Sequence, residues 1–243
     1  MSLLTIAQNV ASSIPVTKPT QIVGNTDQTS SLILSAAQKA GKSISKKRNS
    51  NGGWLILQKE HTFTTVASQV DYTLPSDYER IVQDTLWDRS NFWEMRGPLT
   101  PASWQMYKSS VLGNSVSLRV RYRIRNSSST KVFSIDPTPS SADDMVFEYV
   151  SDEWCQSSGS TGQSAWAADT DTGIIDEYLI ELDTLWRVLK RMGMSYGEEK
   201  YEAETEIDKA LAADGGSGRI SLNTNTGTHL IDAGNVPDTG FGV

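Results

Sequence analysis

The sequence has few of the residues that build disulfide-bonded scaffolds or metal sites. Among its 243 residues there is one cysteine, Cys155, and there are two histidines, His61 and His229. A single thiol cannot form an internal disulfide, which excludes an oxidised secreted scaffold. One cysteine and two histidines are also too few soft ligands for a structural zinc site. We therefore expect neither a metal nor another cofactor.

Long apolar segments are absent as well. No apolar run approaches the roughly 18 residues that a membrane-spanning helix needs, so we expect no membrane partner. The first ten residues are mostly apolar, but they lack a basic segment and are interrupted by Thr5, Gln8 and Asn9. This pattern is unlike that of a secretory signal.

The sequence also lacks a recognisable catalytic grouping. Neither histidine lies in a known nucleophile motif. Cys155 follows Trp154 in an acidic stretch, and nearby negative charge disfavours the reactive thiolate form of a cysteine. We predict that the protein is not an enzyme.

Three pairs of carboxylates need an explanation, because paired carboxylates can serve acid–base chemistry or bind a cation. The pairs at residues 143–144 and 152–153 are most simply a solvated acidic surface. The third pair, Asp169 and Asp171, lacks the further ligands of a calcium loop. We expect Asp171 to cap the helix that follows, with Asp176 in its first turn.

The net charge of −7 is the sum of very different stretches. Residues 1–139 contain 16 Lys and Arg against 9 Asp and Glu, a net charge of +7. Residues 140–214 contain 5 against 18, a net charge of −13, and residues 215–243 carry −1. A basic portion is thus joined to an acidic one. The negative total argues against a general nucleic-acid binder.

Apolar residues at helical spacing mark both ends of the chain. They predict a helix over residues 3–11 and a second helix that begins at Thr26 or Asp27. After a Ser- and Gly-rich stretch, a wide apolar stripe over residues 174–192 predicts the strongest helix of the chain. A highly charged helix is expected to follow, ending at about residue 213.

Between these helices the pattern changes to that of strands. The segments from Trp54 to about Trp154 predict a β region, including a hairpin of residues 81–87 and 92–95. A capping threonine followed by a proline predicts a short helix near residues 100–110.

Together these segments predict an α+β fold. We expect a helical bundle formed by the N- and C-terminal helices, with an inserted, mainly antiparallel β domain and an extended C-terminal tail. The tail contains seven glycines and few charges, and it cannot bury enough surface to fold alone. The expected divisions are residues 1–53 (N-terminal helices of the bundle), 54–156 (β domain), 157–213 (C-terminal helices of the bundle) and 214–243 (tail).

A row of arginines alternates with apolar residues in one predicted strand. Because side chains in a strand alternate between its faces, all four guanidinium groups should project from one side. They could hold an acidic protein surface or phosphates, or they could pair with Glu148, Asp143 and Asp144 of a neighbouring strand. These candidate interface residues are Arg119, Arg121, Arg123 and Arg125.

Several segments of the sequence resemble segments of the head-to-tail adaptor (connector) proteins of tailed bacteriophages. They are scattered over most of residues 25–214, and none of them is a catalytic motif. These segments are Gln69-Val-Asp-Tyr-Thr-Leu-Pro-Ser-Asp-Tyr-Glu-Arg-Ile, Asp84-Thr-Leu-Trp-Asp-Arg, Gly97-Pro-Leu-Thr-Pro-Ala-Ser-Trp-Gln, Ala168-Asp-Thr-Asp-Thr-Gly-Ile-Ile-Asp-Glu, Leu185-Trp-Arg-Val-Leu-Lys-Arg-Met-Gly and Tyr201-Glu-Ala-Glu.

The resemblance implies a structural protein of the virion, assembled in the host bacterial cytoplasm. Such adaptors form a ring of twelve copies beneath the portal, extend the DNA channel and offer a platform to the next tail component, a nozzle or a tail tube. DNA would pass through the channel without sequence-specific binding. The C-terminal segment of such proteins often grips the portal, and here the apolar residues for that grip would be Ile220, Leu222, Leu230, Ile231, Val236 and Phe241.

Two hypotheses about charge follow from this ring. The arginine row of one copy would meet the acidic helices of its neighbour, and acidic side chains would line part of the channel so that DNA slides. The alternatives are another tail-completion or baseplate component, or a carbohydrate-binding β module that uses some of the seven tryptophans. Of these, Trp87 and Trp186 are expected to lie in the core.

Overall fold

The N-terminal helices begin where the capping residues predict. In the computed structural model, which describes residues 1–49, 52–109, 120–127 and 130–215, α1 (Leu3–Ser13) follows Ser2, whose hydroxyl accepts the Thr5 N–H. Helix α2 (Gln28–Ser45) follows Asp27, whose carboxylate accepts two N–H groups of the first turn. A side chain that accepts these otherwise unpaired N–H groups stabilises a helix start.

The C-terminal helices are α4 (Glu177–Met192) and α5 (Gly197–Asp214). The predicted cap of α4 is wrong: Asp176, not Asp171, accepts the first-turn N–H, at Tyr178. Helix α4 also begins later than its apolar stripe, because residues 174–175 direct their N–H groups to the Trp154 carbonyl instead of into the helix. At the other end of α4, Gly193 adopts φ +74°, a left-handed conformation that suits glycine.

These four helices share one hydrophobic core. Each contributes a stripe of buried aliphatic side chains, and the small residues of α2 let the helices approach closely. The core is completed by residues outside the helices, among them Trp54, Leu57, Val150 and Trp154. Its helical members include Leu3, Ile6, Val10, Ile33, Ala36, Ala37, Ala40, Ile44, Leu179, Ile180, Val188, Leu189, Ile207 and Leu211.

Antiparallel strands form the β region. One sheet has the order β1-β8-β4-β5, with β3 also pairing β8, and a second sheet has the order β2-β7-β6. A short helix, α3 (Pro101–Ser109), lies between β5 and β6 in the chain, as predicted. The strands are β1 (Gln58–Thr64), β2 (Asp71–Thr73), β3 (Tyr78–Ile81), β4 (Trp87–Asp88), β5 (Trp93–Glu94), β6 (Arg121–Ser127), β7 (Thr130–Asp136) and β8 (Asp144–Ser151).

The two sheets bury an aromatic core between them. The Phe133 ring of β7 stacks at 5.7 Å on that of Phe147 of β8, which joins the two sheets, and at 5.1 Å on that of Tyr122 in its own sheet. Strand β8 is buried on both faces along most of its length: of its eight residues only Asp144 and Glu148 are exposed.

Some details of the β region differ from the prediction. The strand expected over residues 81–87 is not continuous: β3 ends at Ile81, β4 begins at Trp87, and Asp84 in the turn between them adopts φ +61°. The β4–β5 hairpin is present, with Trp87 opposite Glu94. The Ser- and Gly-rich stretch contributes to a small sheet that the pattern did not predict, formed by β9 (Cys155–Gln156), β10 (Gly162–Gln163) and β11 (Thr172–Gly173).

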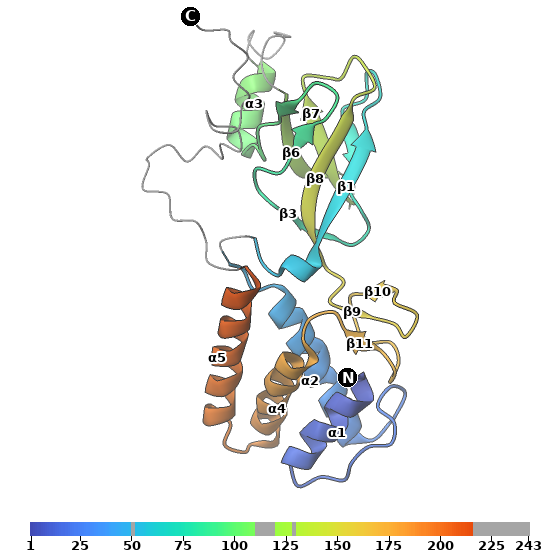
Figure 1. Ribbon diagram of the computed structural model, residues 1–243, viewed down its shortest axis with the longest axis vertical. Helices are drawn as coiled ribbons and strands as arrows, with labels where there is room; N and C mark the ends of the chain where they lie inside the picture. Colours follow the sequence, from blue (N-terminus) through green and yellow to red (C-terminus); the bar gives the residue numbers. More distant parts are fainter. Residues whose placement is uncertain (50–51, 110–119, 128–129, 216–243) are drawn as a thin grey trace, which may run out of the picture.

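Figure 1 shows α1, α2, α4 and α5 at one end of the long axis, and the two larger sheets with α3 at the other. The chain is therefore mixed α+β with antiparallel sheets, as predicted. The division into domains at residues 53, 156 and 213 stays a prediction. In the described residues, no helix combines the length and apolar character that a membrane span requires.

Candidate interaction sites

The chain passes from sheets to helices at Trp154. This side chain is 1% exposed, its indole N–H donates to the Ser164 carbonyl at 2.8 Å, and its ring meets that of Trp166 edge-on at 5.0 Å. Gly41 of α2 lies directly against it, since a Cβ there would be 2.1 Å from the indole ring. Trp154 thus anchors the end of β8 in the helical core.

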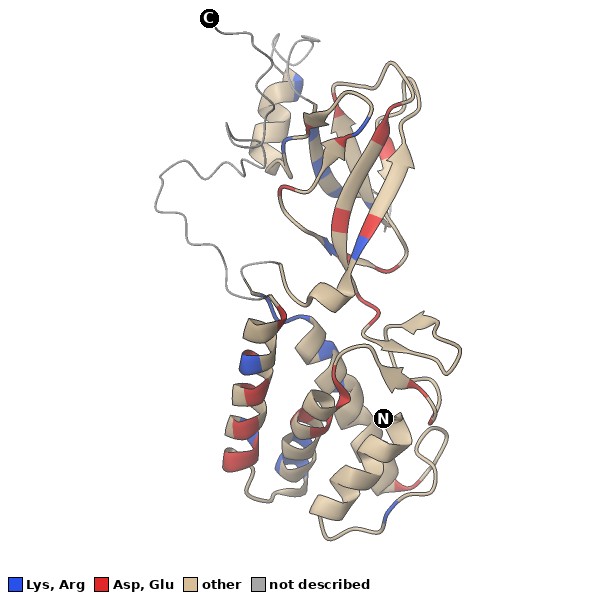
Figure 2. Cartoon of the chain, viewed as in Figure 1, with Lys and Arg blue, Asp and Glu red and all other residues tan. Residues whose placement is uncertain are grey.

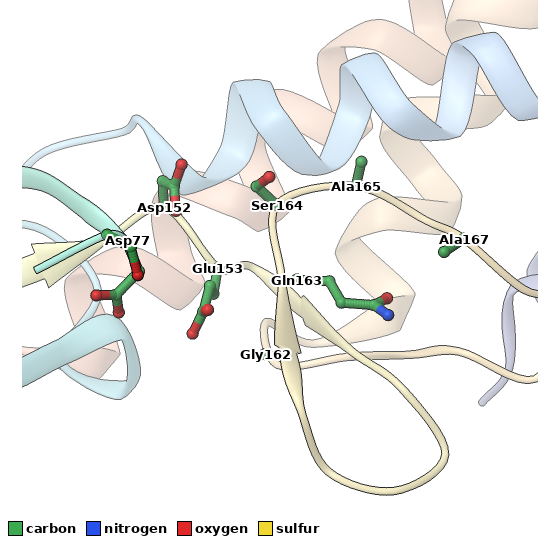
Figure 3. A pocket seen from close by; sticks show the side chains of 9 residues that line it. Asp77, Asp152, Glu153, Gly162, Gln163, Ser164, Ala165 and Ala167 are labelled. Carbon is green, nitrogen blue, oxygen red and sulfur yellow. The ribbon is translucent and has the colours of Figure 1, made fainter. Parts of the chain in front are cut away.

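A polar cluster surrounds the same junction. The Lys59 ammonium lies 2.7 Å from both the Asp77 and Glu153 carboxylates, which come from different segments of the chain. The hydroxyls of Tyr149 and Ser151 also donate to Asp77, at 3.0 and 2.8 Å. Beside this cluster is a hollow of about 390 Å³ (Figure 3). It is lined by Ser76, Asp77, Asp152, Glu153, Gly162, Gln163, Ser164, Ala165 and Ala167.

The environment of the junction shifts the pKa of several groups. Burial raises the pKa of Asp77, but the hydrogen bonds from Lys59, Ser151 and Tyr149 outweigh it and hold the pKa below its ordinary value. Burial, aided by the Asp77 carboxylate, raises the pKa of Tyr149 to about 12. Burial also raises the pKa of Asp152, and the nearby Glu79 and Asp77 charges raise it further. At neutral pH the cluster therefore holds an ionised Asp77 against a charged lysine.

This chemistry supports a structural role for the junction. Burial raises the pKa of the Cys155 thiol to about 12, as do the Asp171 and Glu153 charges, so this thiol is a poor nucleophile. His61 packs against Phe147 with ring centroids 5.3 Å apart, and its burial lowers its pKa. Within the described ranges, no group of three or more potential ligand side chains could hold a metal ion.

The Asp169 and Asp171 pair has a role that the sequence did not indicate. Asp169 accepts the N–H of Val23 at 2.7 Å, in the loop that leads to α2. Asp171 is 1% exposed and accepts two N–H groups of its own turn, while its carbonyl accepts the Leu3 N–H at 2.9 Å. The pair therefore fastens the N-terminal helices to the C-terminal half. No local pattern could predict this, because its partners are about 150 residues away.

The other two carboxylate pairs also differ from a simple solvated surface. Glu153 of the second pair belongs to the junction cluster with Lys59. In the first pair, Asp144 accepts the Thr64 hydroxyl at 2.8 Å and Asp143 accepts that of Ser141. Glu153 and Asp144 thus join segments that lie 94 and 80 residues apart in the chain.

The arginine row lies on β6, where Arg121 is not available to a partner. Its guanidinium is 2.8 Å from Asp136 and 4.1 Å from the ring centroid of Tyr107, because α3 covers this end of the strand. Arg125 pairs with Asp71 at 2.6 Å, and its side chain is 41% exposed. The expected partners on β8 are not used, because β7 and not β8 is the neighbour of β6. Arg123 is half-buried, and Arg119 lies outside the described residues.

The predicted tail residues also lie outside the described residues, which end at 215. The residues concerned are Ile220, Leu222, Leu230, Ile231, Val236 and Phe241. Their contact with a portal stays a prediction.

The tip of the β4–β5 hairpin exposes three aromatic rings that the strand pattern did not reveal. Trp87, Phe92 and Trp93 are 42%, 82% and 57% exposed, so the expectation that Trp87 lies in the core is wrong. Asp88 is almost fully buried and accepts the backbone N–H groups of Ser90 and residue 91. Phe92 has φ +60°, an uncommon conformation for a bulky residue. The tip is thus a fixed turn with exposed aromatic side chains.

One comparison with known proteins identifies the family. A family model described as the SU10 adaptor protein matches residues 1–226. The chain belongs to this family. SU10 adaptors are head-to-tail adaptors of phages, so membership makes this chain a structural component of the virion that associates with portal and tail components. No curated protein matches the chain. The resemblance noted in the sequence is therefore confirmed at the level of the family.

Proposed function

We propose that this adaptor assembles as a closed ring beneath the portal, extends the DNA channel and provides the attachment platform for the tail. The family match over residues 1–226 carries this proposal. Twelve copies are proposed on the earlier resemblance. No catalytic step is required of the chain, and the poorly nucleophilic Cys155 supports this view.

The junction supports the proposal mechanically. A ring subunit must hold its portal-facing and tail-facing parts in a fixed relation, because an error in one subunit changes the position of both interfaces. Trp154 packs into the helical core, and the cluster of Lys59, Asp77 and Glu153 joins β1 and the loop before β3 to the segment directly before Trp154. We propose that α1, α2, α4 and α5 form the helical bundle of the subunit and that the two larger sheets form the platform for the tail.

The aromatic tip is the best candidate on the described surface for attachment of the next tail component. Exposed aromatic side chains are typical energetic centres of protein interfaces. The buried Asp88 cap holds Phe92 and Trp93 outside the core, so they lose little freedom when a partner covers them.

We also propose the arginine interface, with fewer residues than the sequence predicted. Arg123 and Arg125 would meet acidic residues of a neighbouring copy, while Arg121 stays paired with Asp136. Figure 2 shows acidic residues along α5. We propose that acidic residues of the subunit that no neighbouring copy covers line part of the channel and repel DNA phosphates.

The test is assembly with the purified portal. The full chain mixed with portal should give a complex whose mass exceeds that of the portal by a complete ring of adaptors. A chain that ends at residue 214 should remain folded and lose the complex, because the proposed grip is removed. A full chain that never binds the portal, at any ratio, would overturn the proposal.

A further inference from the structure

A basic hollow lies between α2 and α4, away from the junction. Its volume is about 340 Å³, and one of its walls is the indole ring of Trp186. It is lined by Ala36, Lys39, Trp186, Arg187, Lys190 and Arg191. Four of these six side chains are cationic, in a protein whose net charge is −7.

Most of this positive charge is not neutralised by the fold. Arg187 pairs with the buried Asp183 at 2.7 Å, and the same carboxylate accepts the Trp186 indole N–H at 2.7 Å. Lys39, Lys190 and Arg191 form no ion pair with any residue that the structure describes. The hollow therefore combines an aromatic wall, over which Arg187 and Lys190 lie at 4.6 and 6.0 Å from the Trp186 ring centroid, with three cations that have no carboxylate partner among the described residues.

Helix electrostatics explains only part of this arrangement. Lys190 and Arg191 lie in the last turn of α4, where cations are favoured by the helix dipole. Lys39 belongs to the middle of α2, so that argument does not apply to it. The concave shape and the position of Lys39 point to an anionic partner.

The outer face of α5 has the complementary features. Tyr201 is 73% exposed, and Glu198 lies beside it on the helix surface, three residues earlier. Glu202 is also exposed and lies one turn after Glu198, so it flanks the same outer side of α5. Within the described part of the chain, neither glutamate forms an ion pair. The helix dipole accounts for Glu198 in the first turn but not for Glu202 in the second.

We propose that Tyr201 of one copy, with Glu198 and Glu202 beside it, enters the hollow between α2 and α4 of the next copy. This inference rests on the proposed function, because it assigns the contact between neighbouring subunits of the ring. Two different surfaces meet in it, so the contact is heterologous and can propagate around a closed ring.

Size and charge both favour this occupant. A cavity of about 150 Å³ holds a benzene ring, so a hollow of about 340 Å³ has room for a phenol ring between its charged side chains. The phenol would lie against Trp186, where aromatic pairs are favourable. The two glutamates would meet Lys39, Lys190 and Arg191 at the rim, which fixes the register of the two copies.

Disulfide cross-linking of full-length chains tests the contact directly. Cys155 is fully buried, so introduced thiols should react selectively. The Lys39→Cys and Tyr201→Cys variants, mixed under mild oxidation, should give a cross-linked dimer. A chain that carries both substitutions should give a ladder of longer oligomers. Lys39→Cys mixed with Tyr178→Cys is the matched control, because Tyr178 is 46% exposed but lies outside the proposed contact.

The outcomes separate this inference from the proposed function. Portal-bound assemblies without the Lys39–Tyr201 cross-link would overturn the inference and leave the adaptor function standing. The cross-link in concentrated protein that never binds the portal would support the inference and contradict the function. Absence of the cross-link both in concentrated protein and with the portal also overturns the inference.

Charge reversal gives an independent test. Lys39→Glu should weaken self-association by about tenfold, a size typical of an important interface residue, and Glu202→Lys should restore it. Lys18→Glu makes the same charge change at an exposed position outside the hollow and should have little effect. Salt-sensitive binding of double-stranded DNA that Lys39→Glu abolishes, with self-association unchanged, would show that the hollow binds phosphates and would overturn the proposal.

Discussion

The two ends of this adaptor are held together by different kinds of core. The helical core is mainly aliphatic, and it draws on residues from Leu3 to Leu211. The sheet core is rich in aromatic rings and draws only on residues from about Phe63 to Tyr149. One core therefore depends on both ends of the described chain, whereas the other is built from one continuous stretch.

This difference shows where a substitution should destabilise the molecule most. The sheet core needs only residues of the β region. The helical core needs residues from both ends of the chain, and it therefore forms only when the segment after Trp154 packs against the N-terminal helices. The junction is the last sheet-side segment that the helical core needs. Changes there should affect the helices more than the sheets, and the predictions below test that order.

The largest effect is expected for Trp154→Ala. Loss of a large buried aromatic side chain should lower the free energy of unfolding by about 3–5 kcal/mol. Urea unfolding followed by circular dichroism measures this change, and the helical signal should be lost first. Trp93→Ala removes the same type of side chain from an exposed site and should change stability by less than about 0.5 kcal/mol. Equal losses in the two variants would contradict the assigned role of Trp154.

Asp77→Asn should have the next largest effect. At pH 7 it removes the carboxylate that Lys59, Tyr149 and Ser151 share, at a cost of about 1–3 kcal/mol. The pKa of Asp77 in the folded protein lies below its ordinary value of 3.8. The ionised carboxylate therefore makes its full contribution to the free energy of unfolding at any pH well above 3.8. The stabilities of wild type and variant should converge as the pH falls through the folded pKa.

The control for that experiment is Glu60→Gln. Glu60 pairs with Arg89 at 3.0 Å on the surface, with both side chains about half exposed. Such a pair contributes less than about 1 kcal/mol. A stability difference for Asp77→Asn that stays constant from neutral to strongly acidic pH would contradict the ionic role of Asp77.

A smaller loss is expected for Asp176→Ala, which removes the cap of α4. The free energy of unfolding should fall by about 1 kcal/mol, while Asp176→Asn should keep most of it. Thermal unfolding of the two variants measures the difference. Equal destabilisation by both would mean that the carboxylate acts through its charge and not as a cap.

The smallest effect is expected for Phe92→Gly at the hairpin tip. The ring is 82% exposed, and glycine accepts the positive φ more readily, so stability should change by no more than about 0.5 kcal/mol. Binding of the tail component should nevertheless weaken. A loss of stability of several kcal/mol, measured by urea unfolding, would show that the tip is part of the core.

The sequence was sufficient to predict most helices and the antiparallel character of the β region. Asp27 and the apolar stripe of α2 act locally, so their effect can be read from neighbouring residues. The alternation in β6 also agrees with the structure, in which the apolar residues Tyr122 and Ile124 pack in the sheet core. Such signals depend on periodicity, which a single segment contains.

The candidate sites were harder to predict because they depend on distant partners. Arg121 has a strand pattern typical of a solvated face, but α3 covers it. Asp169 has the spacing of a cation ligand, yet its oxygens bind N–H groups of the loop before α2. Trp87 has a strand position typical of a core residue, but it lies on the exposed face of β4, and Asp88 on the other face is buried. In each case tertiary packing determines the role.

The most direct test of the adaptor function is an image of the head-to-tail junction of the intact phage particle by electron microscopy. The account predicts a closed ring of this chain between the portal and the next tail component, with the residues beyond 214 in contact with the portal. A ring of this chain elsewhere in the tail, or a junction that lacks it, would contradict the account.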